Sequence, residues 1–246
     1  MKGEKYWDRA WSLVDGCTPV SEACDHCWLE AMNHRFHKWE PGTVTTIEDR
    51  LDIPLRTRKP TVWAIWSDLF HEAVPDEFID DAYRVMFNAP QHTYLILTKR
   101  ADRLADFYDA HSDALYFDQA TSWIWHGVTV ENQEQAGKRI PKLLKVPGKK
   151  FLSIEPMLGP IDLTNICITA GEGDIRPWCD IHAVIVGAES GHGARPMKLI
   201  WTASIVEKCK AVPVFVKQIH LHGKLSKDMS EWPEALRVRE LPWASS

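Results

Sequence analysis

The feature that most constrains this chain is a regular alternation of apolar and amphipathic segments, which begins near residue 60. The apolar segments are rich in β-branched and aromatic residues and are almost continuously hydrophobic. Such runs are typical of strands that are buried on both faces of a parallel sheet. After a first strand at 10–14, we expect such strands at 61–68, 92–100, 122–132, 149–156, 182–191 and 212–218.

Amphipathic segments separate these predicted strands. We expect helices at 27–38, 75–89, 101–111, 132–145 and 202–211. Pro141 should kink or restart the fourth of these helices, and the connection 157–181 has no clear period. Strand and helix alternate over about 160 residues, which predicts right-handed βαβ units around a parallel sheet.

Polar residues stand at the carboxyl end of every predicted strand from 61 onward. They are Ser67–Asp68, Thr98–Lys99–Arg100, Glu131–Asn132, Ser153 with Glu155, Glu189–Ser190, and Lys217–Gln218. One such cluster is more often a helix cap than a site. In an open sheet mainly the strands at the switch point supply site residues, whereas in a barrel all strand ends face one mouth. The pattern therefore favours an α/β barrel, full or partial, over 1–218, with 219–246 as an appended extension.

Three of the six cysteines, spaced C-x6-C-x2-C, fall in the loop 15–28, which follows the first predicted strand: Cys17, Cys24 and Cys27. In a cytosolic chain, clustered cysteines suggest metal binding or catalysis before disulfides. Catalytic zinc takes three protein ligands plus water, and structural zinc takes four. Three thiolates also suffice for a [4Fe–4S] cluster whose fourth iron binds another ligand. A loop with three cysteines at a barrel mouth favours the cluster.

Zinc remains the alternative, because three histidines could complete a Cys3His set: His26, His34 and His37. The last two lie on a predicted helix, where surface histidines are common.

The net charge of −5 implies no general electrostatic attraction to nucleic acid. The basic stretch 138–150 is best explained as a solvated helix face, with a phosphate contact as the minority interpretation. Some of the twelve tryptophans could line a pocket for a flat substrate. No apolar run approaches the length of about 18 residues that spans a bilayer. We therefore expect a cytoplasmic protein without a membrane segment.

A series of blocks resembles a known family from about residue 13 to 218. The blocks are "GCTPVSEACDHCW", "WSDLFHEAVPDEFID", "LILTKRADRL", "GVTVENQEQAGKRIPKLLKV", "FLSIEPMLGPIDL", "VIVGAESGHGARPM" and "VFVKQ". Together and in this order they resemble a three-Cys-motif family of phages and bacteria, long described as of unknown function. That family is similar to a divergent branch of the radical S-adenosylmethionine (SAM) enzymes.

The resemblance implies a partial (β/α)6 barrel and a [4Fe–4S] cluster on the three cysteines, with SAM on the fourth iron. In such enzymes, reductive cleavage of SAM gives a 5′-deoxyadenosyl radical that abstracts hydrogen from the substrate. An external electron donor such as flavodoxin or ferredoxin is implied. Two departures stand out. Cys17 lies three residues further away than in the common C-x3-C-x2-C spacing, and "WSDLF" replaces the usual Gly-Gly-Glu.

The same resemblance suggests roles for the polar strand ends. Cofactor contacts are predicted from Ser67, Asp68, Lys99, Glu131 and Ser153. Catalytic roles are predicted for Glu155, Glu189 and Lys217, with Ser190 and Gln218 also available to the substrate. Lys99 would suit the carboxylate of SAM.

A phage setting makes a nucleotide or a modified DNA base the expected substrate, with isomerase, lyase and transferase chemistry all open. A flipped-out base would need aromatic and basic surroundings. Two alternatives are a zinc-dependent barrel enzyme and a non-catalytic protein that binds nucleic acid or a protein partner.

Overall fold

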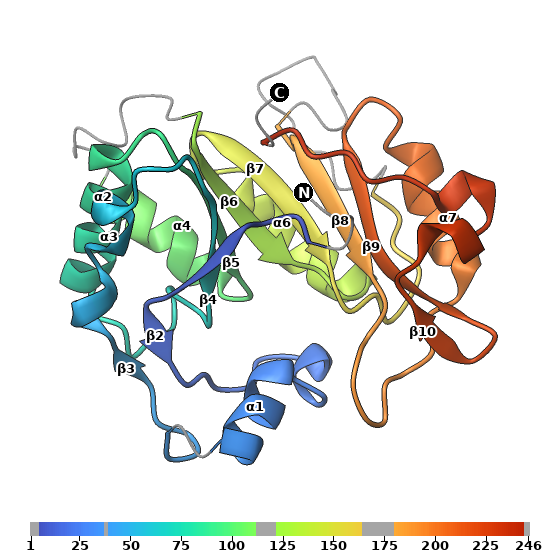
Figure 1. Ribbon diagram of the computed structural model, residues 1–246, viewed down its shortest axis with the longest axis horizontal. Coiled ribbons are helices and arrows are strands. Elements are labelled where there is room, and N and C mark those ends of the chain that lie inside the picture. The colour runs from blue at the N-terminus through green and yellow to red at the C-terminus, as the bar shows by residue number, and fades with distance from the viewer. Residues whose placement is uncertain (1–4, 37–38, 112–121, 164–179, 244–246) are drawn as a thin grey trace.

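A mostly parallel eight-stranded sheet forms the centre of the protein (Figure 1). The computed structural model describes residues 5–36, 39–111, 122–163 and 180–243. The strands follow the order β1-β4-β5-β6-β7-β8-β9-β10, and within it only the β9–β10 pair is antiparallel in the described residues. Their bounds are β1 Arg9–Ser12, β4 Val62–Trp66, β5 Thr93–Thr98, β6 Ile124–Thr129, β7 Lys149–Ile154, β8 Ala183–Gly187, β9 Val214–Leu221 and β10 Lys224–Ser226.

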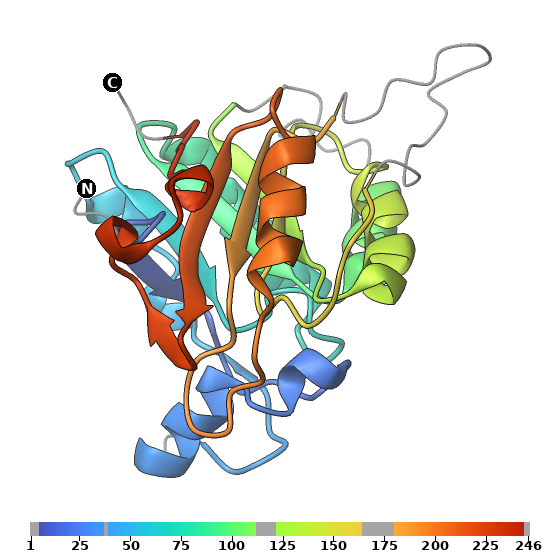
Figure 2. The ribbon, with the colours of Figure 1, turned by 90° about the vertical axis from the view of Figure 1, so that its right-hand side faces the viewer.

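Helices connect most of the parallel strands and cover the outer face of the sheet (Figure 2). The helices are α1 Trp28–Phe36, α2 Ile53–Arg56, α3 Asp76–Asn88, α4 Ala101–Ala110, α6 Gln133–Leu143 and α7 Leu199–Lys208. Short 3₁₀ turns lie at Glu22–Cys24, Glu48–Arg50, Met229–Glu231 and Glu234–Leu236, and a small hairpin pairs β2 Val14–Asp15 with β3 Thr45–Thr46. The mixed α/β class predicted from the alternation is therefore confirmed.

The helix α6 differs from its prediction at Pro141. We expected the proline to kink or restart the helix, but one helix runs through it to Leu143. Leu144 N–H donates to Ile140 O at 3.0 Å, so the hydrogen-bond ladder resumes beyond the proline. Because Pro141 stands in the last turn, few bonds depend on its missing N–H. The expectation of a restart was wrong.

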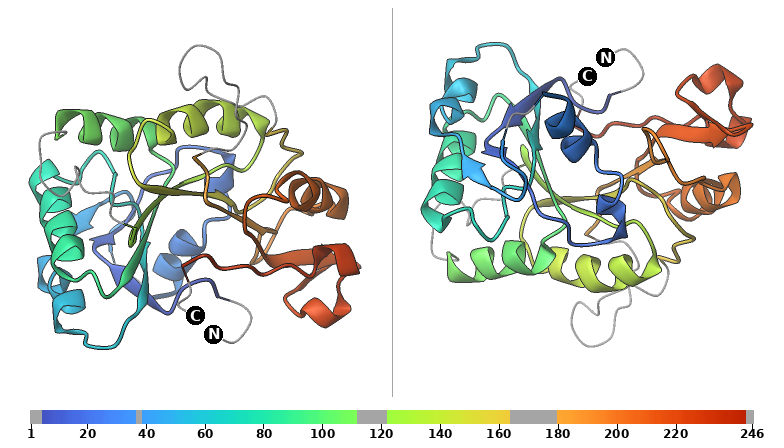
Figure 3. Two further views of the ribbon diagram at one scale, coloured as in Figure 1. Left: turned by 90° about the horizontal axis from the view of Figure 1, so that it is seen from above. Right: turned by 90° about the horizontal axis from the view of Figure 1, so that it is seen from below.

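The sheet curves strongly, so that its helix-free face becomes concave (Figure 3). Aromatic side chains fill this face near the amino ends of the strands. Trp243 packs edge-on against Trp125 and Phe151, with ring centroids 4.9 and 5.8 Å away, and its indole N–H donates to Tyr6 O at 2.8 Å. The two ends of the described chain thus meet in one cluster. Among the described strands, β1 and β10 do not pair with each other, so the sheet is open.

The expected division between a domain at 1–218 and an extension at 219–246 falls within β9, which continues to Leu221. The described part of the extension packs back onto this strand, since Arg239 bridges to Phe215. None of the helices in the described ranges is long and apolar enough to span a membrane. Most of the connection 157–181, for which no structure was predicted, lies outside the described residues.

Two glycine-to-alanine substitutions should change stability in opposite directions. A Cβ at Gly127 in β6 would stand 2.4 Å from the Phe151 ring, whereas a Cβ at Gly137 on the exposed face of α6 meets nothing within 4 Å. We expect Gly127→Ala to lower the free energy of unfolding by about 2 kcal/mol through overpacking. Gly137→Ala should raise it by about 0.5–1 kcal/mol, because alanine favours the helix.

Urea denaturation of both variants checks this prediction, and Gly137→Ala serves as the matched control for the chemical change. Equal stability of the two variants would contradict the close packing of Phe151 over β6.

Candidate functional site

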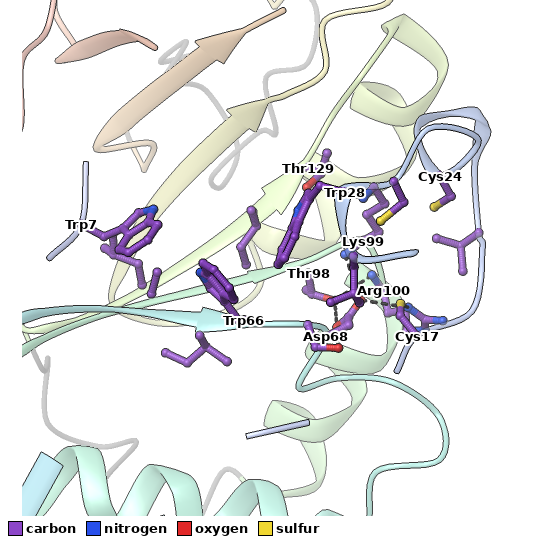
Figure 4. Close-up of a pocket in the computed structure, with 18 of the residues that line it drawn as sticks. Trp7, Cys17, Cys24, Trp28, Trp66, Asp68, Thr98, Lys99, Arg100 and Thr129 are labelled. Atoms are coloured by element: carbon purple, nitrogen blue, oxygen red, sulfur yellow. Dashed lines mark hydrogen bonds and ion pairs between the residues drawn. The ribbon is translucent and has the colours of Figure 1, made fainter. Parts of the chain in front are cut away.

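A cavity of about 330 Å³ lies at the carboxyl ends of the strands (Figure 4). The three clustered cysteines line it, together with an aromatic wall and several polar strand ends. Its polar and sulfur-bearing lining comprises Cys17, Thr18, Cys24, Cys27, Ser67, Asp68, Thr98, Lys99, Arg100, Thr129, Ser190 and Lys217. The strand ends that meet here come from β4, β5, β6, β8 and β9. Residues from the ends of five separate strands thus contribute to one site.

The cysteine loop begins at Gly16, where only glycine fits. Its φ is 84°, and a Cβ there would stand 1.9 Å from Thr43 O. The Gly16 carbonyl accepts a 2.5 Å hydrogen bond from the Ser67 hydroxyl. Ser67 itself has a φ of 65°, in the left-handed region that is uncommon for a non-glycine residue. The predicted cofactor residue Ser67 therefore ties the end of β4 to the start of the cysteine loop.

Asp68 and Arg100 form a buried ion pair beside the cavity. Arg100 Nη1 lies 2.9 Å from Asp68 Oδ2, and the side chains are only 4% and 8% exposed. Asp68 Oδ1 also accepts from the Thr98 hydroxyl at 2.6 Å and from Phe70 N–H at 3.1 Å. Both carboxylate oxygens are therefore occupied by groups of the protein. Glu72 provides a second acceptor for Arg100, at 2.7 Å from Nε.

Arg100 joins this ion pair to the cysteine loop. Its Nη1 donates to Cys17 Sγ at 3.6 Å, and its Nη2 donates to Thr18 O at 3.0 Å. Burial, and after it the Asp68 carboxylate, raises the pKa of the Cys17 thiol, while Arg100 acts in the opposite direction. The guanidinium is thus placed to stabilise a thiolate at Cys17.

The direction of the hydrogen bonds at the Thr18 hydroxyl can be assigned. His71 Nδ1 accepts from Ala73 N–H at 3.1 Å, and burial followed by the Arg100 charge lowers the pKa of His71. The neutral ring then carries its proton on Nε2, which donates to Thr18 Oγ1 at 2.8 Å. Arg100 Nη2 donates to the same oxygen at 2.8 Å. With both lone pairs engaged, the Thr18 hydroxyl proton has no acceptor among the described residues, and Thr18 lines the cavity.

Another part of the cavity wall combines aromatic rings with Lys217, which forms an ion pair. Trp66 contacts Trp7 and Trp28 edge-on, with ring centroids 5.7 and 4.8 Å away. Lys217 Nζ lies 3.0 Å from Glu155 Oε1. The structure thus brings these two residues, both predicted to be catalytic, into direct contact.

Other predicted site residues do not line the cavity, as far as the described residues define it. They are Glu131, Ser153, Glu155, Glu189 and Gln218. Glu131 is fully buried and pairs with Arg139 at 2.8 Å. Gln218 donates to the Ala188 carbonyl at 2.7 Å, and Glu189 pairs with Arg195 at 2.5 Å. Their predicted functional roles stay untested. Four of them have structural partners, whereas the buried Ser153 hydroxyl has no hydrogen-bond partner among the described residues.

Several cavity residues were missed by sequence reasoning. Arg100 was recognised only as part of a polar strand end, and Thr18 only as a member of the cysteine loop. Trp7, Trp28 and Trp66 belong to a composition signal that could not separate core from pocket. Arg195, which does not line the cavity, was not singled out either, because its contacts with Glu22 and Asp25 join positions that are remote in sequence.

Carboxylates pair with three of the six basic residues in the stretch 138–150. Lys138 pairs with Glu134, Arg139 with Glu131 and Lys142 with Asp102, at 2.6, 2.8 and 2.7 Å. The stretch belongs to α6 and its exit, on the outer face of the sheet (Figure 3). This arrangement supports the solvated helix face over a phosphate-binding surface.

Removing the charge of Asp68 should destabilise the folded protein. In Asp68→Asn the buried Arg100 keeps only Glu72 as a charged partner, so we expect a loss of about 3 kcal/mol in the free energy of unfolding. Asp80→Asn is the matched control, because Asp80 pairs with exposed Arg84 within α3 at 2.7 Å. That change should cost about 0.5 kcal/mol or less. Thermal and urea denaturation measure both, and similar losses would contradict the special position of Asp68.

Comparison with known proteins yields one match. A sequence profile of the family described as "Protein of unknown function (DUF5131)" matches residues 3–238. No curated protein matches the chain, and no solved structure does. Because the profile extends over nearly the whole sequence, the chain belongs to the DUF5131 family.

Proposed function

We propose that this protein is a radical SAM enzyme that holds a [4Fe–4S] cluster on Cys17, Cys24 and Cys27. The observation that carries the proposal is that three thiols line one cavity at the carboxyl ends of a curved parallel sheet. In this interpretation the open sheet is a partial barrel of the radical SAM type. Active sites of α/β barrels lie at this end of the strands.

The number of thiols, and their place in one cavity, favours a cluster over a single metal ion. Structural zinc takes four protein ligands, whereas three thiolates suffice for a cluster because each binds a different iron. Among the described residues, no group of three His, Cys, Asp or Glu side chains forms a ready site for one ion. His26 and His34 are exposed, and His37 lies outside the described residues.

When bound, the cluster would supply the electron that cleaves SAM reductively. The protein's own contribution on the Cys17 side is a fixed positive charge. Arg100, held by Asp68 and Glu72, donates to Cys17 Sγ and keeps the loop in place. Because the Asp68 oxygens are already occupied, its proposed role is to position Arg100 and not to bind the ammonium group of SAM.

An anionic group of the cofactor can be held next to Cys17. The Lys99 ammonium has no ion-pair partner among the described residues, and the residue lines the cavity. The Thr18 hydroxyl proton is available there too, since its oxygen already accepts two hydrogen bonds. We assign these two donors to the carboxylate of SAM.

The aromatic end of the cavity is the proposed substrate side. Trp7, Trp66 and Phe151 offer flat apolar surfaces, and Lys217, which Glu155 holds in an ion pair, offers a hydrogen-bond donor. This combination suits a planar base, so the proposed substrate is a nucleotide or a base of modified phage DNA. The external electron donor, for which flavodoxin or ferredoxin was expected, stays a prediction.

Iron and sulfide content after anaerobic reconstitution provides the main test. Wild-type protein should bind about four irons per chain and turn brown, as a cluster on three thiolates requires. Cys17→Ser, Cys24→Ser and Cys27→Ser should each lose most of this iron. Cys209→Ser is the control, because Cys209 is buried at the carboxyl end of α7 and does not line the cavity. Addition of dithionite and SAM should then release 5′-deoxyadenosine only from proteins that retain the cluster.

The alternatives predict different results from the same samples. A zinc enzyme would be colourless, would contain one zinc per chain and would take up no iron. A non-catalytic binding protein would bind its ligand without cleaving SAM. Either result would overturn the proposed function.

A further inference from the structure

The loop between β8 and α7, residues 188–198, lies beside the cysteine loop 15–28 in two perpendicular views (Figures 1 and 2). We propose that Glu189 and Arg195 form a latch that fixes the second half of the cysteine loop, around Cys24 and Cys27. Glu189 is then a positioning residue and not a catalytic one. The functional meaning of the latch rests on the proposed cluster, but its existence can be tested without one.

Hydrogen bonds to Glu189 hold Arg195 in one conformation. Glu189 is 4% exposed, and both of its carboxylate oxygens accept hydrogen bonds from the same residue. Arg195 N–H and Nε donate to Oε2 at 2.7 and 2.9 Å, and Nη2 donates to Oε1 at 2.5 Å. These three bonds occupy most of the acceptor sites of the buried carboxylate and hold it in one orientation, and Glu189 does not line the cavity as the described residues define it.

Arg195, held in this way, also contacts the cysteine loop. Its Nη2 donates to Glu22 O at 2.8 Å, and its Nη1 lies 3.4 Å from Asp25 Oδ2. Glu22 and Asp25 flank Cys24 in the sequence, so one guanidinium contacts the loop on both sides of that cysteine. Removal of Arg195 would also leave the buried Glu189 carboxylate without its partner.

Two more contacts reach the same part of the loop. Gly193 packs against the ring of His26, so that a Cβ at this position would stand 3.2 Å from Cε1. Asn132, at the end of β6, donates to Glu22 Oε1 at 2.5 Å. His26 directly precedes Cys27, and both contacts therefore act on the segment from Glu22 to Cys27.

Separate sets of residues hold the two halves of the cysteine loop. Ser67 and Arg100 fix the loop near Gly16 and Cys17, from the ends of β4 and β5. Arg195 fixes the loop around Cys24 from the β8 side. Loss of the latch should therefore affect Cys24 and Cys27 and leave Cys17 in place.

The first test uses the metal-free protein under reducing conditions. We expect Arg195→Gln and Glu189→Gln to raise the alkylation rates of Cys24 and Cys27 about tenfold, as loss of charge-assisted hydrogen bonds predicts. The alkylation rate of Cys17 should change little. Peptide mass spectrometry with iodoacetamide resolves the three rates. Unchanged rates at Cys24 and Cys27 in both variants would overturn the latch.

Matched controls separate the latch from general destabilisation. Arg103→Gln removes an arginine that pairs with Asp76 away from the cavity, and it should change none of the three rates. Arg195→Lys keeps the charge and should restore part of the protection. The double variant Glu189→Gln/Arg195→Gln should resemble each single variant, because both remove the same interaction.

The reconstituted protein distinguishes a latch from a catalytic Glu189. We expect both Gln variants to lose the cluster faster in air and to show a changed electron paramagnetic resonance spectrum of the reduced cluster. Full retention of the wild-type spectrum and iron in Glu189→Gln, with loss of SAM-dependent activity in that variant alone, would restore its catalytic assignment and refute the latch. If wild-type protein binds no iron, the proposed function fails while the alkylation rates still decide the latch.

Discussion

The buried ion pair between Asp68 and Arg100 is the interaction on which the candidate site depends. It joins the ends of two neighbouring strands, and its remaining donors reach the cysteine loop at Cys17 and Thr18. A buried guanidinium is tolerated only if its donors are satisfied, and here Glu72 completes the set. The geometry of the loop is therefore coupled to the correct pairing of β4 with β5, and a fold that lacked this register would leave a charge unpaired.

Much of the fold could be predicted from hydrophobic pattern alone. Seven parallel strands and the main helices lie close to their expected ranges, because a strand buried on both faces must be apolar throughout. The gathering of polar strand ends at one cavity also follows from parallel topology. Short elements such as α2, β3 and β10 carry too few residues for a period, and they were not predicted. The contact between Tyr6 and Trp243 on the concave face joins the two ends of the described chain, and no local pattern encodes it.

The roles within the site were less predictable than its location. Sequence patterns show which polar residues reach the carboxyl ends, but not which of them neutralise one another. Three candidate acids already have cationic partners: Glu131 forms an ion pair with Arg139, Glu155 with Lys217, and Glu189 with Arg195. Such pairing is expected wherever several charges are buried together, since an isolated charge is costly. A polar residue at a strand end therefore indicates where a site lies, but it does not show that the residue is catalytic.

The cysteine loop is held from several strands, and this bears on how it could receive a cluster. A free loop would lose conformational entropy on binding, at about 1 kcal/mol or more for each residue ordered. Here Ser67, Arg100, Asn132 and Arg195 contact the loop from the connections that follow four different strands. The loop is thus already ordered when the protein has folded. The longer spacing between Cys17 and Cys24 therefore need not weaken the binding of a cluster. A wide spacing between the first two cysteines is compatible with a defined ligand set when separate anchors hold its two halves.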